Sequence, residues 1–285
     1  MMPKKLINPL VKPYLKWAGG KRQLLPDIRR HLPDNFSSYT YYEPFIGAGA
    51  VLFDTQPRNA IINDFNEQLI LTYQAIRDNV KELIDALRVH AQNNNEEYYY
   101  DVRAQDRNAN EFNRLTSIEK AARLIYLNKT CYNGLYRVNA QGLFNVPYGR
   151  YTRPAICEEP VLKAIHNYFK DNGIQILNGD FAAAVQNANQ RSFVYFDPPY
   201  HSPDNTNFTG YQAGGFGEEA QTRLRDTFVV LSEHGVKCLL SNSDTQFIRN
   251  LYQNFEIVEV QAKRAINSDA AGRGDVSELL IKSWR

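Results

Sequence analysis

Short apolar runs recur along the chain, and several of them end in a polar or acidic residue. They are continuous rather than alternating and rich in β-branched and aromatic residues, which is typical of strands buried on both faces of a parallel sheet. A polar, glycine-containing loop separates the last two runs, which are predicted to pair as an antiparallel ribbon at the sheet edge. The runs are YYEPF (41–45), AIINDF (60–65), IQILNGDF (174–181), FVYFDPPY (193–200), VKCLLSNSD (236–244), FEIVEVQA (255–262) and SELLIKSW (277–284).

Segments with apolar residues at helical spacing lie between these runs. One extends from 67 to 90, and another from 218 to 234 ends just before Gly235, a residue type that often caps helices. The alternation of strands and helices predicts an α/β fold with a doubly wound, mostly parallel, seven-stranded sheet.

One long segment interrupts this alternation. About a hundred residues separate the second and third strands, far more than a single crossover needs. The interruption predicts an inserted, mainly helical module at 91–166. The remaining residues, 1–90 and 167–285, would then form one domain.

Charge is nearly balanced over the 285 residues, with a formal net charge of +2. A surface for nucleic acid must therefore be local. The stretch 121–157 has no acidic residue and contains both cations and aromatic rings, a pattern typical of phosphate and base contacts. A solvated face with a few core tyrosines is the alternative. The cations are Arg123, Lys129, Arg137, Arg150 and Arg153, and the rings are Tyr126, Tyr132, Tyr136, Phe144, Tyr148 and Tyr151.

Other composition features exclude several classes of protein. The three cysteines are far apart without a CxxC pair, which argues against a zinc ribbon or disulfide framework and favours a reducing cytoplasm. The five histidines show no metal-ligand spacing, so we expect no metal. No apolar run approaches the ~18 residues of a membrane span, and the basic N-terminus lacks the apolar core of a secretory signal.

The segment EPFIGAGAVLF places Gly47 and Gly49 between a predicted strand and a helix. Glycines at this point let the backbone approach a ligand, although Leu52 breaks the GxGxxG pattern and a simple tight turn is the alternative. Asp64 ends the next strand, where it would accept hydrogen bonds from ribose hydroxyls or cap the following helix. In KWAGGK, the GK pair is followed by Arg22 and no strand precedes it, which disfavours a P-loop. A ligand with a ribose and no phosphates fits better.

The segment DPPY follows the fourth predicted strand directly. Asp197 would accept a hydrogen bond from an exocyclic amine, and Pro198, which has no N–H, leaves a carbonyl free to accept another. Pro199 stiffens the turn, and Tyr200 offers a flat face for a planar base. A proline turn with a surface acid is the alternative.

These motifs together resemble the Dam/DpnM-type DNA adenine-N6 methyltransferases of the α class, over nearly the whole chain. The family implies a Rossmann-like domain that uses S-adenosylmethionine to methylate adenine N6 in double-stranded DNA, usually in GATC, after flipping the base out of the helix. DPPY alone is shared with other amino-methyltransferases, and Ala48 stands where many members have a glycine. The landmarks are KWAGGK, EPFIGAG, IIND, YNGLYRVN, FNVPYGRY, GDF, DPPY, FTGY and LSNSD.

The resemblance also implies roles for individual residues. Catalysis would rest on Asp197, Pro198 and Tyr200. For the cofactor, Trp17 and Lys21 lie near the methionine part and Asp64 holds the ribose. The loop of Pro44, Phe45, Gly47 and Gly49 underlies the nucleoside, Asp180 and Phe181 flank the adenine, and Asp197 borders the same site. The DNA-binding residues are Tyr132 as a wedge between bases, Asn133, Leu135, Arg137 and Pro147 as base readers, and Arg150.

Several further expectations follow from this interpretation. The loops 201–217 and 263–274 are expected to close over the DNA, and the protein is expected to be a monomer in a bacterial or phage-infected cytoplasm, associated with the nucleoid. A companion restriction endonuclease is possible. The alternatives are an RNA or protein-glutamine N-methyltransferase and a non-catalytic DNA-binding module. Cytosine-C5 methylation is disfavoured because the chain has no Pro-Cys nucleophile.

Overall fold

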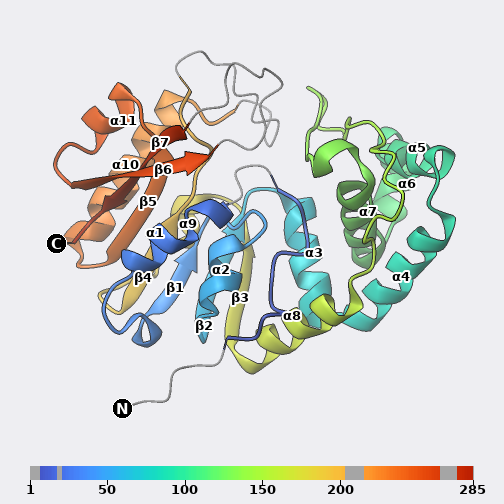
Figure 1. The fold of residues 1–285 in the computed structure, drawn as a ribbon, viewed down its shortest axis with the longest axis horizontal. Coiled ribbons are helices and arrows are strands. Elements are labelled where there is room, and N and C mark those ends of the chain that lie inside the picture. The colour runs from blue at the N-terminus through green and yellow to red at the C-terminus, as the bar shows by residue number, and fades with distance from the viewer. Residues whose placement is uncertain (1–6, 18–20, 203–214, 264–274, 285) are drawn as a thin grey trace.

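A seven-stranded sheet in the order β3-β2-β1-β4-β5-β7-β6 forms the centre of the protein in a computed structural model (Figure 1). The structure describes residues 7–17, 21–202, 215–263 and 275–284. Strands β1 to β5 are parallel, whereas β7 runs antiparallel to β5 and β6. The predicted fold class and edge ribbon are confirmed. The strands are β1 (Thr40–Glu43), β2 (Asn59–Asp64), β3 (Gly173–Asn178), β4 (Ser192–Phe196), β5 (Lys237–Ser243), β6 (Glu256–Lys263) and β7 (Asp275–Lys282).

Strand β4 shows why the apolar runs are continuous. Its residues are all buried, and successive side chains point to opposite faces of the sheet. Phe193 and Tyr195 enter one hydrophobic core, whereas Val194 and Phe196 enter the other. Because helices cover both faces, every position of this strand needs an apolar or hydrogen-bonded side chain.

Some of the helices cover the sheet, and others form a separate group at one side of it. The segment 67–90 is two helices rather than the one that its periodicity suggested. Asn79 ends α3 and precedes α4 with a non-helical backbone, as its competing side-chain amide favours. The helices are α1 (Leu25–Arg30), α2 (Ala50–Thr55), α3 (Glu67–Asp78), α4 (Val80–Asn93), α5 (Glu96–Ala104), α6 (Ala109–Arg114), α7 (Ser117–Thr130), α8 (Glu159–Asp171), α9 (Phe181–Ala184), α10 (Glu218–Glu233) and α11 (Gln246–Leu251), with short 3-10 turns at η1 (Lys21–Gln23), η2 (Phe36–Ser38), η3 (Gln105–Arg107) and η4 (Tyr132–Gly134).

Helices α4 to α7 lie beside α3, away from the strands (Figure 1). Helix α7 begins with a capping box between Thr116 and Glu119 and packs against both α3 and α4. The proposed domain limits at 91 and 166 fall inside α4 and α8. Since α8 also packs on α3 and β3, the helical module is joined to the sheet by packed helices.

Within the described residues, no helix is long and apolar enough to cross a membrane. No group of three or more His, Cys, Asp or Glu side chains in the same residues is arranged to hold a metal ion.

Candidate functional site

The loop between β1 and α2 is folded around the end of β2. Gly47 and Gly49 both have positive φ angles, of 49° and 71°. The Gly47 N–H donates to Asp64 Oδ2 at 3.1 Å, and the Tyr73 hydroxyl donates to the Gly47 carbonyl at 2.8 Å. A Cβ atom on Gly47 would lie 3.2 Å from Trp17, so glycine is needed here for both conformation and space.

Asp64 closes this loop and does not cap α3 with its side chain. Its Oδ1 accepts from the Asn66 N–H at 2.9 Å, and it is Asn66 that caps the helix through Leu69. Burial raises the pKa of Asp64 to about 6, against the opposing effect of the backbone N–H groups of Asn66 and Gly47. The carboxylate is therefore poised to change charge near neutral pH.

An aromatic cluster lies between the loops that follow β1 and β3. Phe45 stacks on Phe181 with 5.2 Å between ring centroids, and Phe216 packs edge-on against Phe45. The buried Asn63 amide donates to the carbonyls of Pro44 and Gly179 and so holds the two loops together.

Asp180 is held beside this cluster. It accepts from the Ala182 N–H and pairs with Arg223, whose guanidinium lies 4.2 Å from the Phe181 ring centroid. The Arg223 hydrogen bond keeps the pKa of Asp180 below its usual range, so this carboxylate stays charged.

Asp197 lies just beyond β4, at the carboxyl edge of the parallel strands. Its Oδ1 accepts from Lys21 Nζ at 2.8 Å and from the Ser241 hydroxyl at 3.0 Å, and Ser241 also contacts the Tyr195 hydroxyl. Burial raises the pKa of Asp197, whereas the Lys21 charge and both hydrogen bonds lower it. No donor to Oδ2, or to the Pro198 carbonyl, is found within the described ranges.

Tyr200 is held at both its ring and its hydroxyl. The hydroxyl donates to Glu278 Oε2 at 2.8 Å, and Lys21 Nζ lies 4.4 Å from the ring centroid. Lys21, expected near the methionine part of a cofactor, thus contacts both Asp197 and Tyr200. Trp17, which precedes Lys21 in the sequence, stacks on Tyr136.

The turn after α7 is presented to solvent. Asn133 and Gly134 adopt consecutive left-handed conformations, and Tyr132 is 54% exposed. The Tyr132 N–H donates to the Pro147 carbonyl, which joins the two sides of the turn. Exposed side chains here include Asn133, Arg137, Pro147 and Arg150, and Leu135 is half-buried.

Buried Asn128 ties this turn to the N-terminal segment. Its Oδ1 accepts from the Lys16 N–H, and its Nδ2 donates to the carbonyls of Lys16 and Gly134. Together with the stack of Trp17 on Tyr136, these bonds join the exposed turn to Lys16 and Trp17 of the N-terminal segment.

Comparison with known proteins decides what this arrangement is. Residues 17–266 match the family model of the D12 class N6 adenine-specific DNA methyltransferases. The chain belongs to this family. It is therefore an enzyme that methylates N6 of adenine in DNA, which speaks against the RNA, protein-glutamine and non-catalytic alternatives.

Curated relatives of the methyltransferase match it over nearly their whole length. Type II methyltransferase M1.LlaDCHI of Lactococcus lactis subsp. cremoris is 41% identical, with 100% of this chain and 99% of the relative covered. Type II methyltransferase M.MjaIII of Methanocaldococcus jannaschii is 42% identical, with 96% and 99% covered. The DNA adenine methylase of Escherichia coli K12 is 36% identical, with 94% and 93% covered.

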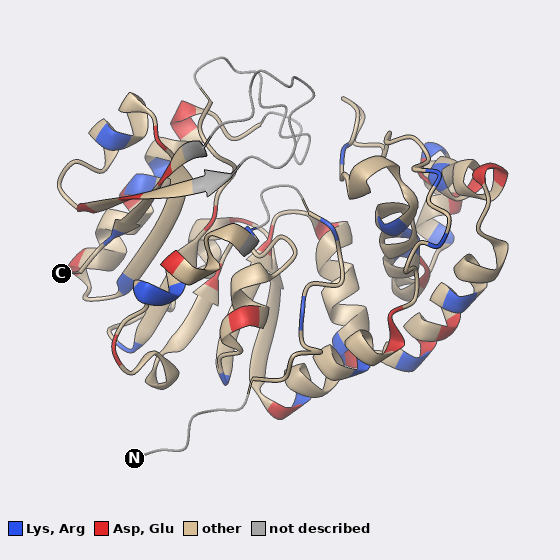
Figure 2. Cartoon of the chain, viewed as in Figure 1, with Lys and Arg blue, Asp and Glu red and all other residues tan. Residues whose placement is uncertain are grey.

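The basic stretch of the methyltransferase contains fewer free cations than its sequence suggested. Arg123 is 1% exposed, pairs with Asp106 and donates to two backbone carbonyls. Lys129 pairs with Glu158. Acidic and basic segments are interspersed over the helical module (Figure 2). Three cations of the stretch are exposed. Arg150 pairs with Glu96, and Arg137 donates through Nε to Asn145. The third is Arg153.

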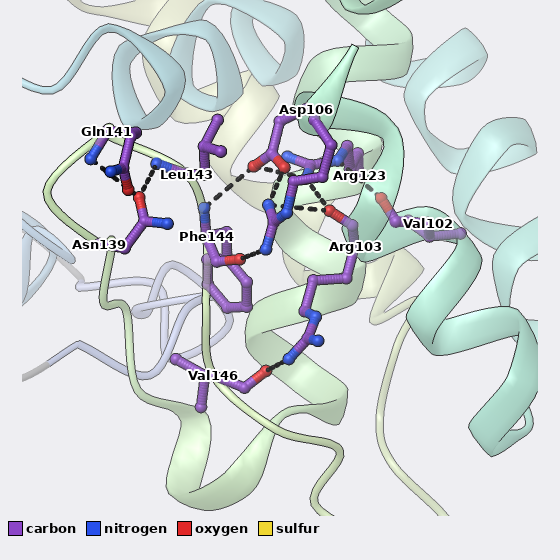
Figure 3. A network of polar contacts seen from close by, with 10 residues as sticks. Val102, Arg103, Asp106, Arg123, Asn139, Gln141, Leu143, Phe144 and Val146 are labelled. Atoms are coloured by element: carbon purple, nitrogen blue, oxygen red, sulfur yellow. Dashed lines mark hydrogen bonds and ion pairs between the residues drawn. The ribbon is translucent and has the colours of Figure 1, made fainter.

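Buried Asp106 and the arginines around it fasten the exposed turn to the helices, as Figure 3 shows. Asp106 accepts from the Phe144 N–H at 3.0 Å, and Arg107 donates to the Phe144 carbonyl. Arg103 donates to the Val146 carbonyl at 3.1 Å. The returning side of the turn is thus hydrogen-bonded to side chains from α5 and η3, and Arg123 links them to α7.

Three residues that contact the site were not among its predicted residues. Ser241 contacts Asp197, Glu278 contacts Tyr200 and Arg223 contacts Asp180, each from a distant part of the chain. Ser241 lies in LSNSD, one of the landmarks of the family, at the end of a strand next to β4. Glu278 and Arg223 look like ordinary surface charges in the sequence.

We expect Asp106→Ala to lower the free energy of unfolding by about 3–5 kcal/mol, because it leaves the buried Arg123 charge without its partner. Urea unfolding followed by circular dichroism measures this change. The matched control is Asp85→Ala, which breaks an exposed pair with Arg88 and should change stability by less than about 1 kcal/mol. Equal effects of the two variants would show that the buried pair has no special role.

Proposed function

We propose that the methyl donor is S-adenosylmethionine and that the target is adenine in GATC within double-stranded DNA. The observation that carries the proposal is the hydrogen bonding of the Asp197 carboxylate. Lys21 and Ser241 occupy its Oδ1, and the described residues leave Oδ2 open beside Tyr200. The Gly47–Asp64 contact lies at the same carboxyl edge of the sheet, where α/β proteins of this kind bind nucleotides.

The residues at the end of β4 suit an amine nucleophile. The two N6 protons of adenine would donate to Asp197 Oδ2 and to the Pro198 carbonyl, which favours a pyramidal nitrogen with an available lone pair. That nitrogen would attack the sulfonium methyl in line, so that an N–C bond forms as the C–S bond breaks. The electron pair of the broken bond would stay on the sulfur of the departing thioether, and the proton lost by N6 would pass to water. The sulfonium is already activated, and positioning supplies much of the rate.

The residues around the β1–α2 loop fit the cofactor. Gly47 lets Trp17 pack directly against the loop backbone, and Asp64, which closes the loop, would provide an acceptor for ribose hydroxyls. Pro44, Phe45, Asp180 and Phe181 surround the place for the adenine ring. Trp17 and Lys21 lie where the methionine part would pass, so Lys21 would serve both the cofactor and Asp197.

The exposed turn is proposed to read the DNA. Tyr132, which is 54% exposed, would enter the base stack. The side chains of Asn133, Leu135, Arg137 and Pro147 would contact base edges, and Arg150 would contact the DNA beside them. The target base must leave the duplex, and stacking on Tyr200 at roughly 1–3 kcal/mol per base would offset part of that cost. The loops expected to close over it, at 201–217 and 263–274, lie mostly outside the described residues.

The biological setting is a further part of the proposal. Two of the relatives are named type II methyltransferases, which supports a companion restriction endonuclease for the same site. A monomer acting on chromosomal or phage DNA in a bacterial cytoplasm fits such a role.

Cofactor binding should depend on pH through Asp64. Since burial raises the pKa of Asp64 to about 6, its carboxyl group is charged above this pH. It loses its charge as the pH falls through this value. We expect the S-adenosylmethionine Kd to be constant above pH 7 and to rise toward tenfold per pH unit below 6. Calorimetry measures it. Asp64→Asn should weaken binding at pH 8 and give a flat pH profile, and an unchanged profile would remove Asp64 from the site.

Asp197→Ala should abolish methyl transfer because the target amine loses its acceptor, and it should also lower stability because the buried Lys21 charge loses this partner. Tyr200→Ala should impair base capture, whereas Tyr200→Phe should keep much of the activity, since the ring remains and only the bond to Glu278 is lost. Methylation is measured with labelled cofactor, and base flipping with a fluorescent base analogue at the target. Turnover by Asp197→Ala near that of the wild type would contradict the mechanism.

Arg137 should read a guanine of GATC. Its guanidinium matches the O6 and N7 acceptors of guanine, which is worth ~1–3 kcal/mol of discrimination. Arg137→Ala should relax preference at one base pair in methylation assays on GATC and its single-base variants at fixed salt. Arg153→Ala, an exposed arginine of the same stretch, is the control and should weaken all sequences equally. Uniform loss in Arg137→Ala would leave it as a phosphate contact.

A further inference from the structure

The DPPY turn has few groups by which its backbone can be held. Pro198 and Pro199 have no N–H, so the turn can be fixed only through carbonyls and through the N–H groups that follow. The structure uses both. The Pro199 carbonyl accepts from Gln221 Nε2 at 2.8 Å, and the His201 N–H donates to Asn242 Oδ1 at 3.1 Å.

The two amides that hold the turn also bind each other. Asn242 Nδ2 donates to Gln221 Oε1 at 3.0 Å, which completes a chain of hydrogen bonds from the Pro199 carbonyl to the His201 N–H. Gln221 comes from the first turn of α10 and Asn242 from β5, and both are fully buried. Tyr200 lies between the two backbone groups that this chain fixes.

Stability alone does not require such a pair. Apolar side chains of similar shape can replace a buried hydrogen-bonded pair with little change in stability, whereas a satisfied polar network specifies one geometry. The Ser243 hydroxyl adds a bond of 2.6 Å to the His201 carbonyl, and Glu278 holds the far end of Tyr200. Polar contacts from α10, β5 and β7 therefore converge on one turn.

We propose that Gln221 and Asn242 are positioning residues for methyl transfer. They fix the Pro199–His201 backbone, and through it the Pro198 carbonyl and the Tyr200 ring, in the orientation that the target amine requires. This inference rests on the proposed role of the DPPY turn. Neither amide touches the reacting atoms, so both act through the turn. Because misplacement by about 1 Å can lower a rate ~100-fold, the loss should appear in kcat.

The test compares two variants of Gln221 in single-turnover methylation between pH 6 and pH 9. Gln221→Met packs in the same space without donating, and we expect a loss of ~10–100-fold at every pH. Gln221→Glu should be as slow at pH 9, since its carboxylate cannot donate to the Pro199 carbonyl. As the pH falls, the protonated acid can donate to Pro199 and still accept from Asn242, so the rate relative to the wild type should recover.

Three further measurements separate positioning from other causes. The Kd for S-adenosylmethionine should change less than about twofold in both variants, and the thermal midpoint shows whether they are folded. Asp226→Ala, an exposed change on the same helix, should match the wild type throughout. Wild-type rates in Gln221→Met, a loss explained by weaker cofactor binding or unfolding, or no recovery of Gln221→Glu at low pH would each overturn the proposal. If the wild-type enzyme itself fails on GATC, the proposed function fails instead, and rate ratios on the sequence it does methylate still decide the present one.

Discussion

The ion pair between Lys21 and Asp197 connects the parts of this methyltransferase that must act together. A carboxylate this deeply placed at the end of a central strand needs a nearby positive charge to remain ionised. Lys21 provides it from η1, so this contact joins the end of β4 to a residue far away in the sequence. Lys16 and Trp17, which precede it in the sequence, contact Asn128 and Tyr136 of the helical module.

The two halves of the site are held in different ways. The DPPY turn is fixed by buried hydrogen bonds from Gln221 and Asn242, which suits a reaction that depends on orientation. The exposed turn is hydrogen-bonded to buried Asp106, which pairs with buried Arg123, while Tyr132 and Arg137 remain at the surface. A nearly neutral chain with few exposed cations in this turn would gain specificity from shape and base contacts more than from net charge.

Local patterns predicted the strands well because burial on both faces leaves a continuous apolar run in the sequence. They predicted less well where a single polar residue redirects the chain, as at Asn79, which divides an apparently continuous helix. The charge count of the 121–157 stretch misled for another reason. Composition cannot distinguish a cation that faces DNA from Arg123, whose partner Asp106 lies in a separate turn.

The sequence by itself determined the places of the strands, the glycine loop, the DPPY turn and the family resemblance, since each is written in consecutive residues. The tertiary structure alone decided the partners: Lys21 and Ser241 for Asp197, Glu278 for Tyr200, and Gln221 with Asn242 for the backbone of the turn. Strand order brings these residues together from opposite ends of the chain. The spacing of residues within one segment does not show the strand order, because side chains that meet across a sheet can be far apart in the sequence.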